Sequence, residues 1–331
     1  MKTSWVIGSH GLLGTALSRK LPLTGCKLFA PGERFDWSNE SILSSQFASA
    51  IQKFSFFTSD AQEWQIFWAA GISSMGTPAD HIIPEAQALR NFLKLIGASQ
   101  ELISKPGAIV FASSAGAIYA GSSDYQINEN SLEAPTTPYA HEKIIQEKLV
   151  SSFISSNKLM TGLLARLSTI YGTDQSFNKR QGLLTYIARQ ILINQPVNIY
   201  VPFDTIRDYI TSDDAASIIL SSINAATVPG VYCKIIASEK PTTIAEIIST
   251  FKRIVRRAPK IVTCTSSLSA IYSRRVQFKS VVPPDTSLMP RTNLLVGISQ
   301  VLASELVRYK TSSGYKVHHS CKERSKTILT N

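Results

Sequence analysis

The stretch "SWVIGSHGLLG", residues 4–14, decides the expected fold. It opens with a short apolar run that predicts a buried strand, and a helical pattern follows the run directly. Gly8, Gly11 and Gly14 lie at the junction. Glycines in such a turn let the backbone bend tightly and approach a pyrophosphate, which the helix N-terminus attracts. A tight strand–helix turn of any kind can carry this pattern, but its position here favours dinucleotide binding.

Apolar strands and amphipathic helices continue to alternate after this stretch. Strands that are apolar throughout and separated by helices indicate a parallel sheet covered on both faces. We therefore expect an α/β fold, a doubly wound parallel sheet of Rossmann type with a small C-terminal α/β substrate-binding lobe. Further strands are expected at residues 26–30, 64–71, 107–114 and 161–172, and helices at 41–54, 84–96 and 138–154.

The elements become shorter after Tyr171, too short to build a second large core. Ser212 is expected to cap one helix, and Thr243 with Glu246 has the spacing of a capping box in another. Helices are expected at 182–192, 212–223 and 243–257, and strands at 197–200 and 206–211. The expected units are a dinucleotide-binding domain at 1–172, whose sheet receives a strand from about 206–211, a small lobe at 173–310 and a mobile basic tail at 311–331.

Positive charge is concentrated toward the end of the chain. The 331 residues carry a net charge of +11, and the part from Lys240 onward has 16 basic residues against 4 acidic ones. Such a region can attract nucleic acid, anionic lipid or a phosphorylated small molecule. The basic residues are scattered and form no RNA-binding signature, so we expect no nucleic-acid partner and interpret the charge as a solvated face.

The sequence also disfavours a membrane protein and a protein held together by disulfides or zinc. No apolar run reaches the roughly 18–20 residues that span a bilayer, so we expect no membrane insertion. The four cysteines are far apart and form no CxxC pair, which argues against a disulfide framework and a zinc site. We expect no bound metal and a cytoplasmic location.

The segment "APTTPYAHEK", residues 134–143, places Tyr139 and Lys143 one helical turn apart. Thr137 can cap a helix that begins at the next residue. A lysine ammonium and a positively charged nicotinamide would both favour a tyrosine phenolate, while a protonated tyrosine can donate to a carbonyl oxygen as hydride arrives at carbon. Ser113 and Ser114 end a predicted strand and can supply an orienting hydroxyl. A tyrosine and lysine at this spacing are often incidental; with the glycine turn they predict a proton-transfer site.

The end of the second strand, "FAPGERFDW", bears on whether the cofactor is NAD or NADP, which carries a 2′-phosphate on its ribose. No acid follows the strand directly, although an acid there usually accepts the ribose hydroxyls. Arg34 could pair with a 2′-phosphate or be a solvated loop residue, and Asp36 could contact the adenine. We expect NAD(P), and Arg34 favours NADP(H) slightly.

In their order, these pieces resemble the extended short-chain dehydrogenases/reductases, in particular the NAD(P)-dependent epimerase/dehydratase group that acts on nucleotide sugars. The resemblance covers about residues 4–220 through "GSHGLLG", "WAAG", "SSAGAIYA", "PTTPYAHEK", "ARLSTIYG" and "IRDYITSDDAA". It implies that Tyr139 is the acid and base, that Lys143 binds the nicotinamide ribose and lowers the tyrosine pKa, and that a Ser or Thr completes a triad. The expected cofactor-binding residues besides Arg34 and Asp36 are Gly8, Gly11, Leu12, Leu13, Gly14, Ala69, Ala70, Gly71, Tyr139 and Lys143.

The third member of the triad departs from the family pattern. The family places its Ser or Thr four residues before the tyrosine of a VYG motif, a position occupied here by Ala115. Ser114 precedes Tyr139 by 25 positions, a spacing similar to the family's. We therefore assign the role to Ser114, with Ser113 as the reserve.

The resemblance also limits the types of reaction that we expect. Sugar 4,6-dehydratases carry an Asp-Glu pair after the catalytic Thr, whereas Ala115 and Gly116 follow here. Bifunctional epimerase/reductases use an additional Cys and His near the sugar, and neither residue type occurs between His141 and Cys233. We expect a 4-epimerase, with an NAD(P)H-dependent 4-keto-sugar reductase or a non-catalytic dinucleotide-binding sensor as alternatives.

The expected partner is a nucleoside-diphosphate sugar. Arg207 occupies the position where the resembling family commonly holds the diphosphate, although it could instead pair with Asp204 or Asp208. Asn178 and Arg180 are expected to line the same pocket. A homodimer through two helices of the sheet domain is common in the family and is expected as a possibility here.

Overall fold

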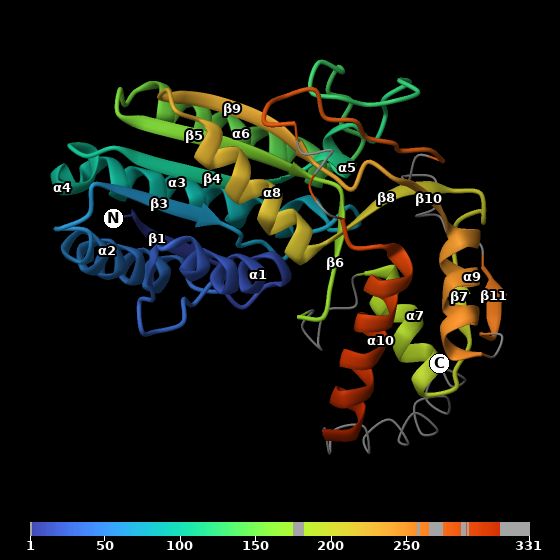
Figure 1. Ribbon diagram of the computed structural model, residues 1–331. Helices are drawn as coiled ribbons and strands as arrows, with labels where there is room; N and C mark the ends of the chain where they lie inside the picture. Colours follow the sequence, from blue (N-terminus) through green and yellow to red (C-terminus); the bar gives the residue numbers. More distant parts are fainter. Residues whose placement is uncertain are drawn as a thin grey trace, which may run out of the picture.

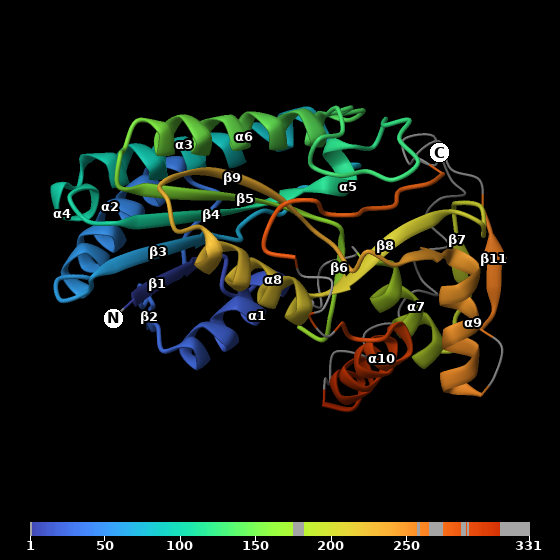
Figure 2. The ribbon, with the colours of Figure 1, turned by 45° about the horizontal axis from the view of Figure 1, so that its top comes forward.

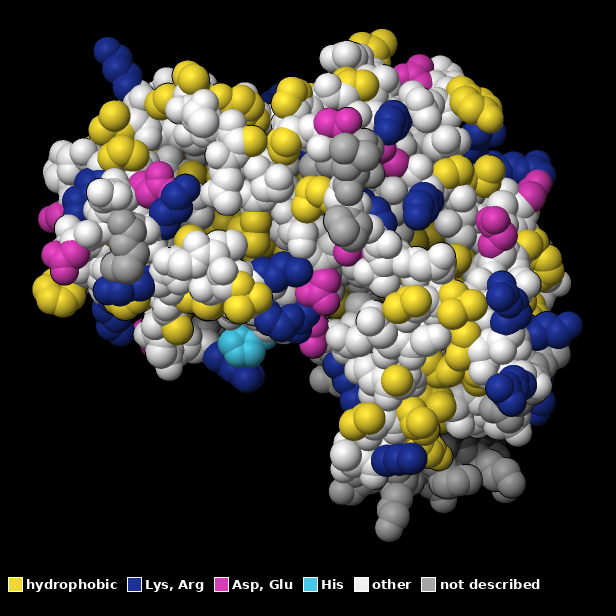
Figure 3. All heavy atoms as spheres, viewed as in Figure 1, with side chains coloured by type: hydrophobic (Ala, Val, Ile, Leu, Met, Phe, Trp, Pro, Cys, Tyr) yellow, Lys and Arg dark blue, Asp and Glu magenta, His cyan; other side chains and the backbone are white. Residues whose placement is uncertain are grey.

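A computed structural model of the chain describes residues 2–174, 182–256, 259–264, 274–285, 289 and 291–311. A sheet with helices on both faces forms one part, and a smaller lobe projects from one end of it, which gives the molecule an L-shaped outline (Figure 1). On the face shown in Figure 3, Lys and Arg side chains lie scattered among acidic and hydrophobic ones over both parts.

The main sheet has six strands in the order β2-β1-β3-β4-β5-β9, and all neighbouring strands run parallel. This confirms the expected doubly wound parallel sheet. β1 lies between β2 and β3, so the direction of the crossovers reverses at β1; in open α/β sheets the ligand crevice lies beyond the carboxyl ends of the strands at such a point, here β1 and β3. The strands are β1 Lys2–Ile7, β2 Lys27–Phe29, β3 Glu63–Trp68, β4 Gly107–Ser114, β5 Met160–Leu167 and β9 Gly230–Ile236.

Helices cover the sheet on both faces (Figure 2). One face carries α2 (Glu40–Phe57), α3 (Ile83–Ala98) and α6 (Pro138–Ser155), and the other carries α1 (Leu12–Lys20) and α8 (Ser212–Ala225). The core under α2 and α3 is rich in edge-to-face aromatic contacts, which add to the free energy of burying apolar area. Its fully buried rings include Trp5, Phe47, Phe54, Trp64 and Phe92. Short helical turns lie at η1 Leu21–Thr24, η2 Ala79–His81, α4 Gln100–Ile103 and α5 Ala115–Ile118.

The smaller lobe has its own hydrophobic core. Two small sheets, β10-β8-β6 and β11-β7, pack with three helices around this core. The elements are β6 Thr169–Tyr171, β7 Val197–Ile199, β8 Ile206–Thr211, β10 Pro241–Thr243, β11 Ile261–Thr263, α7 Leu183–Leu192, α9 Ile244–Val255 and α10 Leu294–Thr311.

The expected strand at 161–172 is two strands, and this changes the sheet. The chain breaks at Ser168, so β5 stays in the main sheet while β6 leaves it. The strand at 206–211, β8, pairs with β6 in the small sheet. We had expected it to join the main sheet, and it does not. The open edge of β5 is covered by β9 instead, in a parallel register from Thr161 opposite Gly230. The expected tail beyond residue 311 lies outside the described residues.

Three helix caps test the local sequence signals. Thr137 accepts a hydrogen bond from the Ala140 N–H at 3.2 Å, and the capping box of Thr243 and Glu246 is complete, so both predictions are confirmed. The Ser212 cap was a wrong prediction. Thr211 is the N-cap, because the extended end of β8 lets its hydroxyl reach the Asp214 N–H at 3.1 Å.

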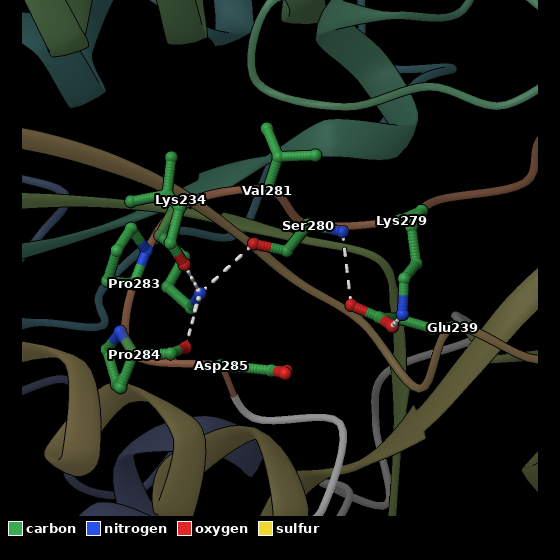
Figure 4. A pocket seen from close by; sticks show the side chains of 9 residues that line it. Lys234, Glu239, Lys279, Ser280, Val281, Pro283, Pro284 and Asp285 are labelled. Carbon is green, nitrogen blue, oxygen red and sulfur yellow. Dashed lines mark hydrogen bonds and ion pairs between the residues drawn. The ribbon is translucent and has the colours of Figure 1, made fainter.

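The segment 274–285, which we call the C-terminal strap, joins the lobe to the edge of the main sheet. It forms isolated β-bridges to Ile206 in the lobe and to Ile127 near the sheet. The buried Lys234 of β9 donates to Ser280 Oγ at 3.0 Å and to the carbonyls of Val282 and Pro284 (Figure 4). A cavity of about 370 Å³ lies against this lysine. The ammonium therefore fixes the strap against the sheet.

Replacing Lys234 by Met should destabilise the protein. The methionine keeps the apolar stem but leaves two carbonyls and a hydroxyl without their donor, which costs about 1–3 kcal/mol. Urea unfolding measures the loss as a lower free energy of unfolding. The control is Lys279→Met, which removes a half-exposed ion pair to Glu239 in the same cavity and should cost about 0–1 kcal/mol. Equal losses in both variants would contradict the role of Lys234.

Candidate active site

The glycine turn between β1 and α1 is the most crowded backbone of the site. Gly8 has φ +85°, and a Cβ atom there would lie 2.7 Å from the carbonyl carbon of Ala69 at the end of β3. A Cβ on Gly14 would lie 2.0 Å from the carbonyl oxygen of Gly8. Gly11 donates its N–H to the same oxygen at 2.9 Å. No side chain fits at Gly8 or Gly14, and the turn therefore brings α1 directly against the end of β1.

The N-terminus of α1 is open to an anion. Its N-cap is Gly11, no side chain caps the helix, and its first turn has no acid. The first N–H groups and the positive end of the helix dipole thus point toward the crevice. Leu13 is buried in the core, and Leu12 is half-buried near Gly172. We infer that these leucines would contribute to cofactor binding through their backbone.

A carboxylate holds the chain that follows β3. Residues 69–71 follow β3 directly, and the last of them, Gly71, has φ +155°. Glu85 on α3 accepts hydrogen bonds from the N–H groups of Ile72 at 2.8 Å and Ser73 at 2.9 Å. Sequence reasoning missed Glu85, because an acid in the first turn of a helix is usually explained by the helix dipole alone.

The structure brings Tyr139, Lys143 and Ser114 together. Ser114 ends β4, and its hydroxyl lies close enough to the half-buried Tyr139 of α6 to act on the pKa of that tyrosine. The buried Lys143 places its Nζ 5.8 Å from the centre of the Tyr139 ring and donates to Gln146 Oε1 at 3.0 Å. Ser113 lies on the opposite face of the strand, and its buried hydroxyl contacts no partner within the described part of the chain.

Burial and charge shift the pKa of Tyr139 in the same direction and the pKa of Lys143 in opposite directions. Burial raises the pKa of Tyr139 well above its ordinary value, the Glu85 carboxylate raises it further, and the hydrogen bond to Ser114 acts in the opposite direction. Burial lowers the pKa of Lys143, and the nearby carboxylates of Glu85, Glu147 and Glu142 raise it. Without cofactor, Tyr139 is therefore a neutral hydroxyl that can donate a proton at neutral pH.

The two residues expected near the adenosine lie in the loop after β2, at the same edge of the sheet as the glycine turn. Arg34 is exposed, and its carbonyl accepts from Gln46 Nε2 at 3.1 Å. Asp36 accepts from the hydroxyl and the N–H of Ser38 at 2.5 and 3.0 Å, and these bonds lower its pKa. Its carboxylate thus stabilises the loop.

The expected substrate residues are only partly within the described chain. Arg207 lies on β8 and donates to the carbonyl of Ile206 at 2.7 Å. The two neighbouring carboxylates have other partners: Asp204 pairs with Arg274, and the buried Asp208 accepts from Ser168 Oγ at 2.6 Å. Asn178 and Arg180 lie outside the described residues. Within the described part of the chain, no group of His, Cys, Asp and Glu could hold a metal ion, and no helix is long and apolar enough to cross a bilayer.

A family model and a curated relative match the chain in sequence. The NAD dependent epimerase/dehydratase family matches residues 5–232, which run from β1 into β9. The dTDP-4-dehydro-6-deoxyglucose reductase of Escherichia coli is 26% identical over 144 residues, or 44% of each chain, so the alignment spans less than half of that relative.

Solved structures share the fold at low sequence identity. RMD from Pseudomonas aeruginosa, complexed with NADPH, has a TM-score of 0.75 and 19% identity over 93% of this chain and 100% of that one. The UDP-glucose 4-epimerase of Thermotoga maritima, with UDP-glucose, has a TM-score of 0.69 and 16% identity over the same shares. At these identities the likeness is one of fold.

The glycine turn predicts a strong effect of Gly14→Ala on cofactor binding. The added methyl would collide with the Gly8 carbonyl, and relieving the clash costs about 1–3 kcal/mol. We expect NADH and NADPH to bind about tenfold more weakly or worse, measured by titrating cofactor fluorescence. Gly76→Ala is the matched control, because a Cβ there meets no atom within 4 Å. Unchanged affinity in Gly14→Ala would contradict a cofactor site at this turn.

Proposed function

The chain belongs to the NAD-dependent epimerase/dehydratase family, and from that premise we propose that it transfers a hydride between NAD(P) and a carbon of a nucleoside-diphosphate sugar. One observation carries the proposal: Tyr139 lies beside Ser114 and 5.8 Å from the Nζ of the buried Lys143, at the sheet edge that also holds the glycine turn. A proton-transfer group and a pyrophosphate site at one edge are what such a reaction requires.

Each side chain has a separate task in this proposal. The nicotinamide, when bound, accepts or supplies the hydride. The N–H groups at Gly11 and the start of α1 hold the pyrophosphate, and Lys143 holds the nicotinamide ribose. Ser114 orients the sugar oxygen, and Tyr139 gives that oxygen a proton or removes one.

Two reactions fit this set. We propose 4-epimerisation, in which one carbon is oxidised and then reduced again, because no Asp-Glu pair for water elimination follows Ser114. The second candidate is reduction of a 4-keto sugar, and the environment of Tyr139 favours it. Burial and Glu85 keep the tyrosine protonated, and a protonated tyrosine is the form that a reductase needs when hydride leaves NAD(P)H.

Two arginines support the choice of cofactor and the place of the substrate diphosphate. Arg34 is exposed in the loop after β2 and supports a preference for NADP(H) through its charge on a 2′-phosphate. Arg207 is half-buried on β8, and its planar guanidinium suits a bidentate contact with the diphosphate, which supports this role. Asn178 and Arg180 stay proposed as further residues of that pocket.

We also propose a homodimer through α3 and α6. These helices carry a groove of about 360 Å³ on their outer side, and Ile145 of α6 is 44% exposed beside it. The lining residues are Arg90, Leu93, Lys94, Gly97, Leu149, Phe153, Ser156 and Asn157. A second copy of the same apolar face would cover this groove.

The net consumption of NAD(P)H per sugar converted distinguishes the two reactions. The purified chain is incubated with UDP-, GDP-, CDP- and dTDP-sugars, including 4-keto forms, while NAD(P)H absorbance and the sugar product are followed. Conversion without net change in NAD(P)H supports the epimerase, and stoichiometric consumption supports the reductase. A chain that binds cofactor but leaves every sugar unchanged would favour the sensor alternative.

Tyr139→Phe should lower turnover by about 10²–10⁴-fold, the usual contribution of a positioned acid or base. The phenyl ring keeps the packing, so NAD(P)H affinity measured by fluorescence should be unchanged. Tyr232→Phe is the control, because its hydroxyl contacts only the carbonyl of Val228 among the described hydrogen bonds. Full turnover in Tyr139→Phe would exclude the proposed proton transfer.

The dimer is tested by light scattering of the purified chain. We expect the mass of two chains, and Ile145→Glu should reduce it to one by placing a charge in the covered face. Val307→Glu on α10, which replaces a residue that is 60% exposed in the lobe, should leave the mass unchanged. A single-chain mass for the unmodified protein would overturn the proposal.

A further inference from the structure

Glu85 connects two parts of the site that are far apart in sequence. It lies in the first turn of α3, and one carboxylate oxygen, Oε1, accepts from the N–H groups of Ile72 and Ser73. The other oxygen, Oε2, is 3.3 Å from where a Cβ on Gly71 would stand. The chain between β3 and α3 is thus held by this one side chain at the edge where the cofactor would lie.

The same carboxylate interacts electrostatically with the proton-transfer set on α6. Its charge acts on both Tyr139 and Lys143. The other charged groups around these two are on α6 itself, where Glu142 and Glu147 act on Lys143, and on α3, where Arg90 acts on Glu142. From β4, the group that reaches Tyr139 is the uncharged hydroxyl of Ser114.

A carboxylate at this place changes the equilibrium between the neutral and the ionised form of Tyr139 that Lys143 alone would set. The Lys143 ammonium favours the tyrosine phenolate, which suits a base. The Glu85 charge favours the neutral tyrosine, which suits a proton donor, and it also favours the charged form of Lys143. The charge of Glu85 therefore favours the protonated form of both residues.

We propose that Glu85 is a positioning residue for this site: it fixes the chain at 71–73 beside the cofactor, and its charge acts on the pair of Tyr139 and Lys143. The inference rests on the proposed acid and base role of Tyr139. It deepens that proposal by assigning an electrostatic effect on Tyr139 to a carboxylate outside the triad.

The charge role is tested by titrating Tyr139 directly. Tyrosines labelled at Cζ are followed by NMR, and the Tyr139 signal is identified by its loss in Tyr139→Phe. The samples contain NAD⁺, NADP⁺ or no cofactor. Glu85→Gln removes the negative charge but keeps an acceptor oxygen, so Tyr139 should ionise at a pH lower by about one unit, a tenfold change in its ionisation constant. Glu142→Gln removes a neighbouring charge from the same cluster and should shift Tyr139 less. Equal titration of Tyr139 in Glu85→Gln and the unmodified chain overturns the charge role.

The anchoring role is tested by cofactor binding. Glu85→Ala removes the acceptor for two N–H groups and should weaken NADPH and NADH binding about tenfold, while Glu85→Gln should bind nearly as well as the unmodified chain. Wild-type affinity in Glu85→Ala overturns this role, and circular dichroism confirms that both variants are folded. Neither readout needs a sugar substrate. Failure of these tests is therefore distinct from failure of the proposed reaction, which the sugar panel and Tyr139→Phe report.

Discussion

The approach of α1 to β1 leaves no room for a side chain at Gly14, where a methyl group would lie 2.0 Å from the Gly8 carbonyl oxygen. The rest of the site depends on this contact. Because Gly8 also touches the backbone at Ala69, the turn positions the ends of β1 and β3 together with the start of α1. β4 is the next strand in the sheet, so its last residue, Ser114, reaches the same edge, and α6 packs there with Tyr139 and Lys143.

Chemistry at this edge is governed by a competition between burial and charge. Burial alone makes Tyr139 a weaker acid and lowers the pKa of Lys143. The carboxylates around Lys143 raise its pKa against this effect, and Glu85 among them also disfavours the tyrosine phenolate. The site without cofactor therefore differs from a simple tyrosine–lysine pair, and arrival of a positively charged nicotinamide would act against this bias.

Local signals in the sequence were sufficient for much of the fold. The glycine spacing, the Thr137 cap and the Thr243 capping box are short patterns whose physical cause lies within a few residues, and the structure contains each of them. The break at Ser168 was not predictable in the same way, because its hydroxyl is bonded to Asp208, 40 residues away. Glu85 and the C-terminal strap escaped prediction for the same reason: their partners lie on other elements of the sheet and lobe.

The placement of β9 has a consequence for how the chain is made. β5 ends at Leu167, but the strand that covers its edge begins only at Gly230, after much of the lobe. While a nascent chain leaves the ribosome, the backbone donors and acceptors on the edge of β5 that faces away from β4 therefore stay unpaired until residue 236 has emerged. An incomplete chain that stops before Gly230 would present an open, apolar sheet edge to its neighbours, which is a route to aggregation during synthesis.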